Sequence, residues 1–148
     1  MRGDAMEALD VLIGSWQVAM RNAWFLEPPD REDAGSAQIE WLGDAFVIFR
    51  WTVRGDTGTP SETAIAMGRS DSNDRYVALY HDERGVSRIF AMTFDGALWT
   101  LSREDADMFQ RFSAEVSPDR IAGKWEASDD RGETWRKDFD LEFVRIAG

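Results

Sequence analysis

The sequence predicts an all-β fold, an antiparallel β-barrel of about ten strands that follows one short N-terminal helix. Segments rich in Trp, Phe, Val, Ile and Thr alternate between apolar and polar residues with a period of two, which is typical of strands with one buried face. Turn-forming residues separate these segments at short intervals, with no helical pattern between them. The 148 residues suit one domain with a sizeable core, so we expect a single β-barrel domain over residues 1–148.

The N-terminal segment carries the only helical pattern in the sequence. Apolar residues recur there at helical spacing. Asp4 is predicted to be the N-cap, with Glu7 completing a capping box, and Gly14 is predicted to end the helix. We therefore expect a helix over about 4–13 and the barrel over about 14–146.

The strand prediction depends on a few clear alternations and on the turns between them. Asp95-Gly96 predicts one hairpin, and residues 129–132 predict another. Three sets of residues lie at alternate positions of a segment, the third with Lys137 between its first two members, and we expect each set to face the core: Val47, Phe49, Trp51 and Val53; Ile121, Gly123, Trp125 and Ala127; and Trp135, Phe139, Leu141 and Phe143.

Composition excludes several kinds of chemistry. The chain contains no Cys and one His, which excludes disulfides, a thiol nucleophile and a multi-histidine metal site within one chain. The formal net charge of −11 argues against nucleic acid and anionic membranes as partners. The first 20 residues do not resemble a secretory signal, and no apolar run reaches the length of a transmembrane helix. We therefore expect a cytoplasmic protein with no metal and no cofactor.

The segment Leu12-Ile13-Gly14-Ser15-Trp16 resembles the opening of lipocalin-like barrels, the calycins, in which a helix is followed by Gly-x-Trp. The resemblance implies that Trp16 closes one end of the barrel and that an Arg late in the last strand packs over it. Arg145 is the matching candidate, and a guanidinium can stack on an indole ring.

Longer stretches resemble an uncharacterised bacterial family, a domain of unknown function with a calycin-like barrel. The matching stretches are Tyr80–Val86 with Arg88 and Met92, Gly123–Glu126, and Trp135–Asp140. This resemblance implies a fold and no settled activity. More distantly, the chain is similar to nitrobindin and to fatty-acid-binding-protein-like barrels. Nitrobindin-like barrels bind haem through a His nearer the C-terminus, where this chain has none. His81 therefore matches that haem ligand poorly, and haem binding through His81 is an alternative rather than the leading hypothesis.

Large apolar residues are candidates to line a cavity inside the barrel. Small barrels either fill their interiors with side chains or retain one space of ligand size. Core packing is the first explanation for each of these residues, but together they predict a small-molecule pocket lined by Trp41, Trp51, Met67, Met92 and Trp99.

Polar residues that share a face with core residues are the candidates to orient a ligand. Lys137 shares the face of Trp135 and Phe139, so unbroken alternation would point it inward. Arg88 similarly shares a face with Phe90 and Met92, and Arg111 lies near the apolar residues of its own predicted strand. A buried cation needs a partner, which is either an internal acid or an anionic ligand such as a carboxylate. The alternative is that a β-bulge reverses the phase or that the long side chain reaches a rim.

Tyr80 and His81 complete the candidate ligand-binding residues, at the end of a predicted strand. The leading hypothesis is non-enzymatic binding of a small, mainly apolar molecule in the barrel interior, with an acidic group on the ligand as one option. One alternative is a small barrel enzyme for proton transfer, isomerisation or cyclisation that uses His81, Tyr80, Arg88 or Lys137. Another is a homo-oligomeric structural module with a filled barrel.

Overall fold

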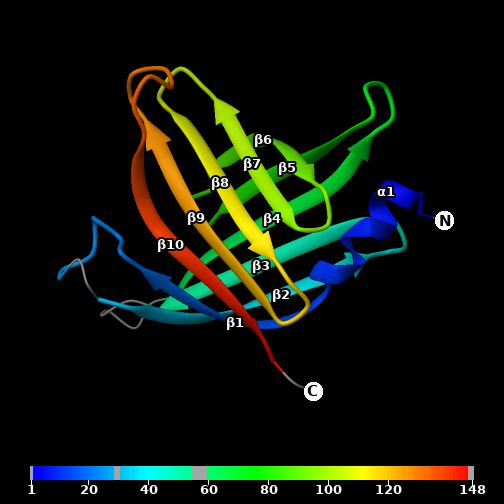
Figure 1. Ribbon diagram of the computed structural model, residues 1–148, viewed down its shortest axis with the longest axis horizontal. Coiled ribbons are helices and arrows are strands. Elements are labelled where there is room, and N and C mark those ends of the chain that lie inside the picture. The colour runs from blue at the N-terminus through cyan, green and yellow to red at the C-terminus, as the bar shows by residue number, and fades with distance from the viewer. Residues whose placement is uncertain (1, 29–30, 55–59, 147–148) are drawn as a thin grey trace.

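Ten antiparallel strands close into a barrel in the computed structural model, which describes residues 2–28, 31–54 and 60–146 (Figure 1). Each strand pairs with its neighbours in sequence, and the first strand also pairs with the last. The predicted fold class is therefore confirmed. The strands are β1 (Gly14–Arg21), β2 (Asp33–Leu42), β3 (Phe46–Arg54), β4 (Pro60–Ser70), β5 (Arg75–Asp82), β6 (Ser87–Phe94), β7 (Leu98–Glu104), β8 (Phe109–Val116), β9 (Arg120–Ser128) and β10 (Arg136–Arg145).

The N-terminal helix differs from the prediction in length and in its cap. It consists of one α-helical turn, α1 (Asp4–Glu7), followed by a 3₁₀ segment, η1 (Ala8–Leu12). The N-cap is Gly3 rather than Asp4, and no side-chain bond caps α1. Gly14 does not end the helix but begins β1. The segment is held by the burial of its apolar side chains rather than by a capping bond. Leu9 and Leu12 are fully buried at one end of the barrel.

Aromatic rings fill the centre of the barrel. Trp99 lies 5.5 Å from Phe49 and 5.2 Å from Phe112, measured between ring centroids. Trp125 continues the cluster, 5.2 Å from Phe112 and 5.6 Å from Phe90. All five rings are buried. The alternation that the sequence predicts for β3 and β9 therefore supplies a packed core.

Contacts between the two ends of the chain close the barrel at the helix. The Arg145 guanidinium carbon lies 4.2 Å from the centroid of the Trp16 ring. Arg145 also donates to the carbonyl oxygens of Ile13 over 2.7 Å and Val11 over 2.8 Å. A Cβ on Gly14 would lie 2.2 Å from Arg145 Nη1, so the missing side chain makes room for the guanidinium. This is the contact that the resemblance to calycins implies.

A β-bulge in β10 overturns the inward orientation predicted for Lys137. Lys137 pairs with Glu126, but the next paired residue of β10 is Phe139, opposite Trp125, so Asp138 is an additional residue. The extra residue reverses the alternation. Lys137 therefore lies on the outer surface, where its Nζ is 3.1 Å from Asp140 Oδ2.

Among the described residues, no helix is long and apolar enough to span a bilayer.

Candidate functional site

Two cavities occupy the end of the barrel opposite α1, which we call the mouth. One has a volume of about 540 Å³ and a mixed lining that includes several charged side chains, and the other has a volume of about 350 Å³ and a mainly apolar lining. Both are lined by Phe25, Ser61, Thr63 and Tyr80. Because they share these residues, we treat them as the polar lobe and the apolar lobe of one site.

Aromatic and aliphatic side chains form most of the apolar lobe, and the ion-paired Arg31 and Asp33 also line it. Trp51 and Phe139 contribute from the barrel wall, and Phe25 contributes from the segment after β1. The Phe25 ring is 50% exposed and packs edge to face against Phe139, with 5.8 Å between centroids. Two neighbours hold this segment at the mouth, because Ala23 is fully buried and Trp24 Nε1 donates to Asp138 Oδ1 over 3.0 Å.

A buried carboxylate organises one side of the polar lobe. The Tyr80 hydroxyl donates to Asp82 Oδ2 over 3.0 Å, and Arg84 Nη2 donates to the same oxygen over 2.7 Å. Hydrogen bonds from Arg84 hold the pKa of the Asp82 carboxyl well below its usual range. Burial raises the pKa of the Tyr80 hydroxyl, and its hydrogen bond to Asp82 raises it further. At neutral pH, Asp82 is therefore ionised and Tyr80 protonated, and neither group is poised to exchange a proton.

Arg88 occupies the other side of the polar lobe. Its Nη1 donates to Gln110 Oε1 over 3.2 Å, and its guanidinium carbon lies 5.6 Å from the centroid of the Tyr80 ring. The same Gln110 oxygen accepts a bond of 2.6 Å from Nε of the buried Arg103. Arg103 is in turn paired with Asp105 and Asp107. Within the described part of the chain, Arg88 has no carboxylate partner.

The predicted ligand-binding residues are divided between the mouth and the packed interior. Tyr80, Arg88 and Trp51 line the mouth. Trp99, Met67 and Met92 are buried in the core and contribute to its packing. Trp41 lies at the helix end of the barrel, where the Arg2 guanidinium carbon is 3.6 Å from the centroid of its ring and Asp10 Oδ1 accepts a hydrogen bond from its indole.

His81 and Arg111 lie on the outside of the barrel, so a role inside it is wrong for both. In β5, Tyr80 and Asp82 face the interior, and alternation leaves His81 exposed on the outer face. It cannot reach a haem or a substrate held inside the barrel. Arg111 Nε donates to Glu126 over 2.9 Å, and its guanidinium carbon lies 3.9 Å from the centroid of the Trp135 ring.

Several residues of the mouth were not predicted from the sequence. Strand alternation could have identified Asp82, two residues after Tyr80, and Gln110, two residues before the buried Phe112. Phe25 and Trp24 lie in a segment without strand periodicity, and only the tertiary structure brings them to the mouth.

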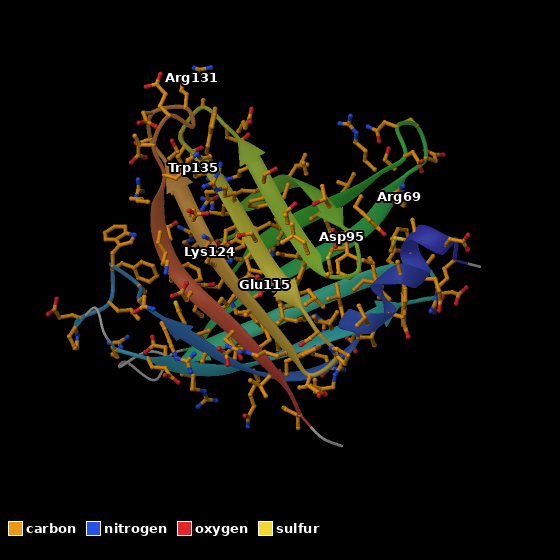
Figure 2. All side chains as sticks on the ribbon, in the orientation of Figure 1. Arg69, Asp95, Glu115, Lys124, Arg131 and Trp135 are labelled. Atoms are coloured by element: carbon orange, nitrogen blue, oxygen red, sulfur yellow. The ribbon has the colours of Figure 1, made fainter. Side chains whose placement is uncertain are left out.

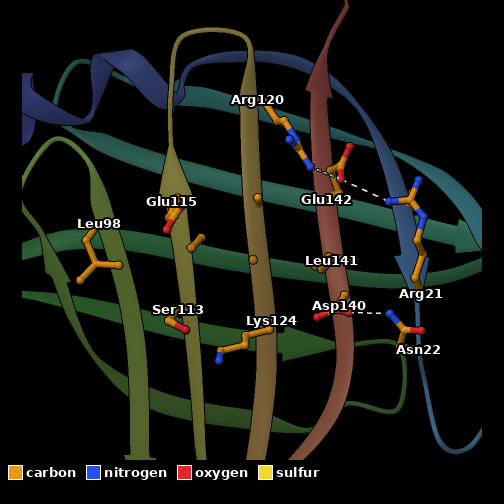
Figure 3. A pocket seen from close by; sticks show the side chains of 14 residues that line it. Arg21, Asn22, Leu98, Ser113, Glu115, Arg120, Lys124, Asp140, Leu141 and Glu142 are labelled. Atoms are coloured by element: carbon orange, nitrogen blue, oxygen red, sulfur yellow. Dashed lines mark hydrogen bonds and ion pairs between the residues drawn. The ribbon is translucent and has the colours of Figure 1, made fainter.

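A third cavity, of about 620 Å³, is a groove on the outer face of the barrel (Figure 3). Glu142 Oε2 accepts hydrogen bonds there from Arg120 Nη2 over 2.7 Å and from Arg21 Nη1 over 3.2 Å. Figure 2 shows Glu115 and Lys124 on the same outer face. Because the charged groups Glu142, Arg120 and Arg21 of this groove are paired with one another, the mouth is the stronger candidate site.

The described residues contain no group of three or more carboxylate or His side chains arranged to hold a metal ion.

Comparison with known proteins supports the fold. The sequence matches no family model and no curated protein sequence. The crystal structure of Rv2717c from M. tuberculosis is similar, with a TM-score of 0.69 and 14% sequence identity over 99% of this chain and 100% of that chain. A redesigned β-barrel is similar with a TM-score of 0.53 and 12% identity over 98% of this chain and 100% of that chain. At these identities the likeness shows the barrel fold alone.

Proposed function

We propose that this protein binds a small, mainly apolar molecule at the mouth of the barrel and does not transform it. The observation that carries the proposal is the apolar lobe of about 350 Å³, which is walled by aromatic side chains and lies next to a polar lobe. Pockets with mainly apolar walls and a few polar groups are typical of small-molecule sites. Because aromatic side chains fill the centre of the barrel, the site is the mouth rather than the deep interior.

Partly exposed aromatic surface supplies the driving force. Phe25 is 50% exposed at the mouth, and a ligand that covers it removes apolar surface from water. Each Å² of apolar surface so buried contributes about 25 cal/mol. The ionised Asp82 and the protonated Tyr80 favour binding over proton-transfer catalysis, because both groups are held in their unreactive states at neutral pH.

A neutral probe tests the proposal. We expect 4-tert-butylbenzyl alcohol to bind saturably, with a Kd of about 10–100 μM by calorimetry, which is reasonable for a ligand of about a dozen heavy atoms. Phe25→Ala should weaken binding about fivefold or more, because it removes a wall of the apolar lobe. Val144→Ala is the control, since Val144 is 43% exposed but lies on the outer face of β10. Absence of saturable binding, or equal losses in both variants, would refute the proposal.

The outer surface favours a second candidate function, self-association of two copies of the chain. Phe46, Leu79 and Ile89 are 58%, 51% and 71% exposed, respectively. Ile48, Ala66, Leu79 and Ile89 are cross-strand neighbours from β3 to β6, so they form one apolar row. A contiguous apolar patch of this kind is typical of interaction surfaces, and a row on one face suits a two-fold contact.

Light scattering tests the second candidate. We expect the mass of the protein to rise towards that of a dimer as its concentration increases, and the double substitution Leu79→Lys with Ile89→Lys to abolish the rise. Val144→Lys, at a position that is 43% exposed outside this row, is the control and should leave the rise unchanged. A monomer at every concentration would rule self-association out.

A further inference from the structure

We infer that the mouth selects compact, ring-containing carboxylic acids, and that Arg88 is the residue that pairs with the carboxylate. The inference rests on the proposed function and adds the ligand's charge, shape and orientation. It follows from three features of the mouth. They are a guanidinium that pairs with no carboxylate among the described residues, the order in which the two lobes adjoin, and the packed core beneath them.

The charge argument concerns the pairing of every guanidinium that lines the polar lobe. Arg84 is paired with Asp82, and Arg136 is paired with Asp129. Arg88 is partly buried, and its one polar contact within the described residues is with the neutral Gln110. A guanidinium has five N–H donors, so most of those on Arg88 are left without a protein acceptor. A partly desolvated cation in this state is stabilised by an anion, and a carboxylate matches its planar donor pattern.

The acids that line the polar lobe do not fill this role. Asp82 already accepts hydrogen bonds from the Tyr80 hydroxyl and from the side chain and backbone of Arg84. Glu83 and Asp138 also line the lobe, but Glu83 accepts a hydrogen bond from Ser61 and Asp138 accepts one from the Trp24 indole. Gln110 presents its oxygen to Arg88 and Arg103, which turns its amide nitrogen away from both guanidiniums.

The order of the lobes sets the orientation of the ligand. Arg88 lies only in the polar lobe, whereas Trp51 and Phe139 lie only in the apolar lobe. Tyr80 and Thr63 line both, so they form the passage between the two. A ligand whose carboxylate pairs with Arg88 therefore places its apolar part past Tyr80, against the aromatic walls.

The packed core sets the size of the ligand. The apolar lobe has a volume of about 350 Å³. At about 30 Å³ for each water-sized unit, that space holds on the order of a dozen heavy atoms. A long alkyl chain would have to displace core rings such as Phe49 and Trp99, which are 2% and 0% exposed. Compact cyclic acids are therefore favoured over long-chain fatty acids.

Three probes at neutral pH test the charge and the size together. They are 4-tert-butylbenzoate, its neutral analogue 4-tert-butylbenzyl alcohol, and hexadecanoate. We expect the benzoate to bind about 10- to 100-fold more tightly than the alcohol, because charge-assisted hydrogen bonds form only with the anion. Hexadecanoate should bind at least tenfold more weakly than the benzoate, because the core leaves no space for its chain.

Two variants show whether Arg88 is responsible. Arg88→Met keeps the volume and removes the charge, so the benzoate should lose about tenfold or more in affinity while the alcohol changes less than threefold. Arg88→Lys keeps the charge but not the planar donor pattern, and should show an intermediate loss. Arg111→Gln is the matched control on the outer face and should leave both affinities unchanged.

The outcomes separate this inference from the proposed function. If both benzoate and alcohol bind the wild-type protein with equal affinity, the carboxylate preference is wrong while apolar binding at the mouth stands. If neither binds, both proposals are wrong. If hexadecanoate binds as tightly as the benzoate, the size argument is wrong. The wild-type comparison needs no variant, so it decides the charge preference even where a substitution at Arg88 prevents folding.

Discussion

Removing the Arg145 side chain tests how the barrel is closed at the helix. In Arg145→Met, the hydrogen bonds to the carbonyl oxygens of Ile13, Val11 and Pro118 are lost, at 2.7, 2.8 and 2.6 Å in the wild-type protein. The stacking of the guanidinium on Trp16, 4.2 Å from the ring centroid, is lost as well.

The expected loss follows from these contacts. Each hydrogen bond contributes a net ~0.5–1.5 kcal/mol where its groups stay partly accessible to water. The cation–π contact adds ~0.5–1 kcal/mol. We therefore expect the free energy of unfolding to fall by about 2–5.5 kcal/mol, which corresponds to a decrease in Tm on the order of 4–22 °C for a chain of this length.

Urea denaturation followed by Trp fluorescence measures this loss as a lower midpoint at an unchanged slope. Arg120→Met is the control, because Arg120 is 58% exposed and its side chain makes one surface ion pair, with Glu142. It should cost less than about 1 kcal/mol. A loss in Arg145→Met no larger than that in Arg120→Met would refute the reasoning, because it would show that the contacts between the two chain ends do not stabilise the barrel.

Two further predictions concern packing and pH. Gly35→Ala should destabilise the protein by about 3 kcal/mol or more in the same denaturation assay, because a Cβ there would lie 1.7 Å from the backbone oxygen of Thr52. Gly68→Ala, whose Cβ would meet its nearest atom at an ordinary 3.5 Å, should be nearly neutral. Asp82→Asn should be less stable than the wild type at pH 7, and the difference in free energy of unfolding should close as pH falls below about 4. The reason is that the pKa of Asp82 is lower in the folded protein than in the unfolded chain. The resulting stabilisation is present above the unfolded pKa and is lost as pH falls through the folded pKa. A gap that is independent of pH from 7 down to 2 would contradict the assigned role of the Asp82 charge.

The expectation of an inward side chain succeeded for Arg88 and failed for Arg111 and Lys137. Arg88 and Lys137 were expected inside because each shares an alternating face with apolar residues, whereas Arg111 was expected there only because apolar residues lie near it in the sequence. In β8, Gln110 and Phe112 take the inward positions, which leaves Arg111 outside. In β10, one bulged residue reverses the phase and turns Lys137 outward. Register is therefore correct along an unbroken strand, and a single extra residue is enough to invert it.

By itself, the sequence determined the alternation of the strands, the turns between them and hence the ten-stranded barrel. These features are local, because the period of two and the turn chemistry depend on neighbouring residues. Only the tertiary structure decided that the aromatic rings fill the centre, that Phe25 reaches the mouth and that Arg88 contacts Gln110 rather than a carboxylate of the described chain. Each of these depends on how closely side chains from distant strands approach one another, and no local pattern specifies those distances.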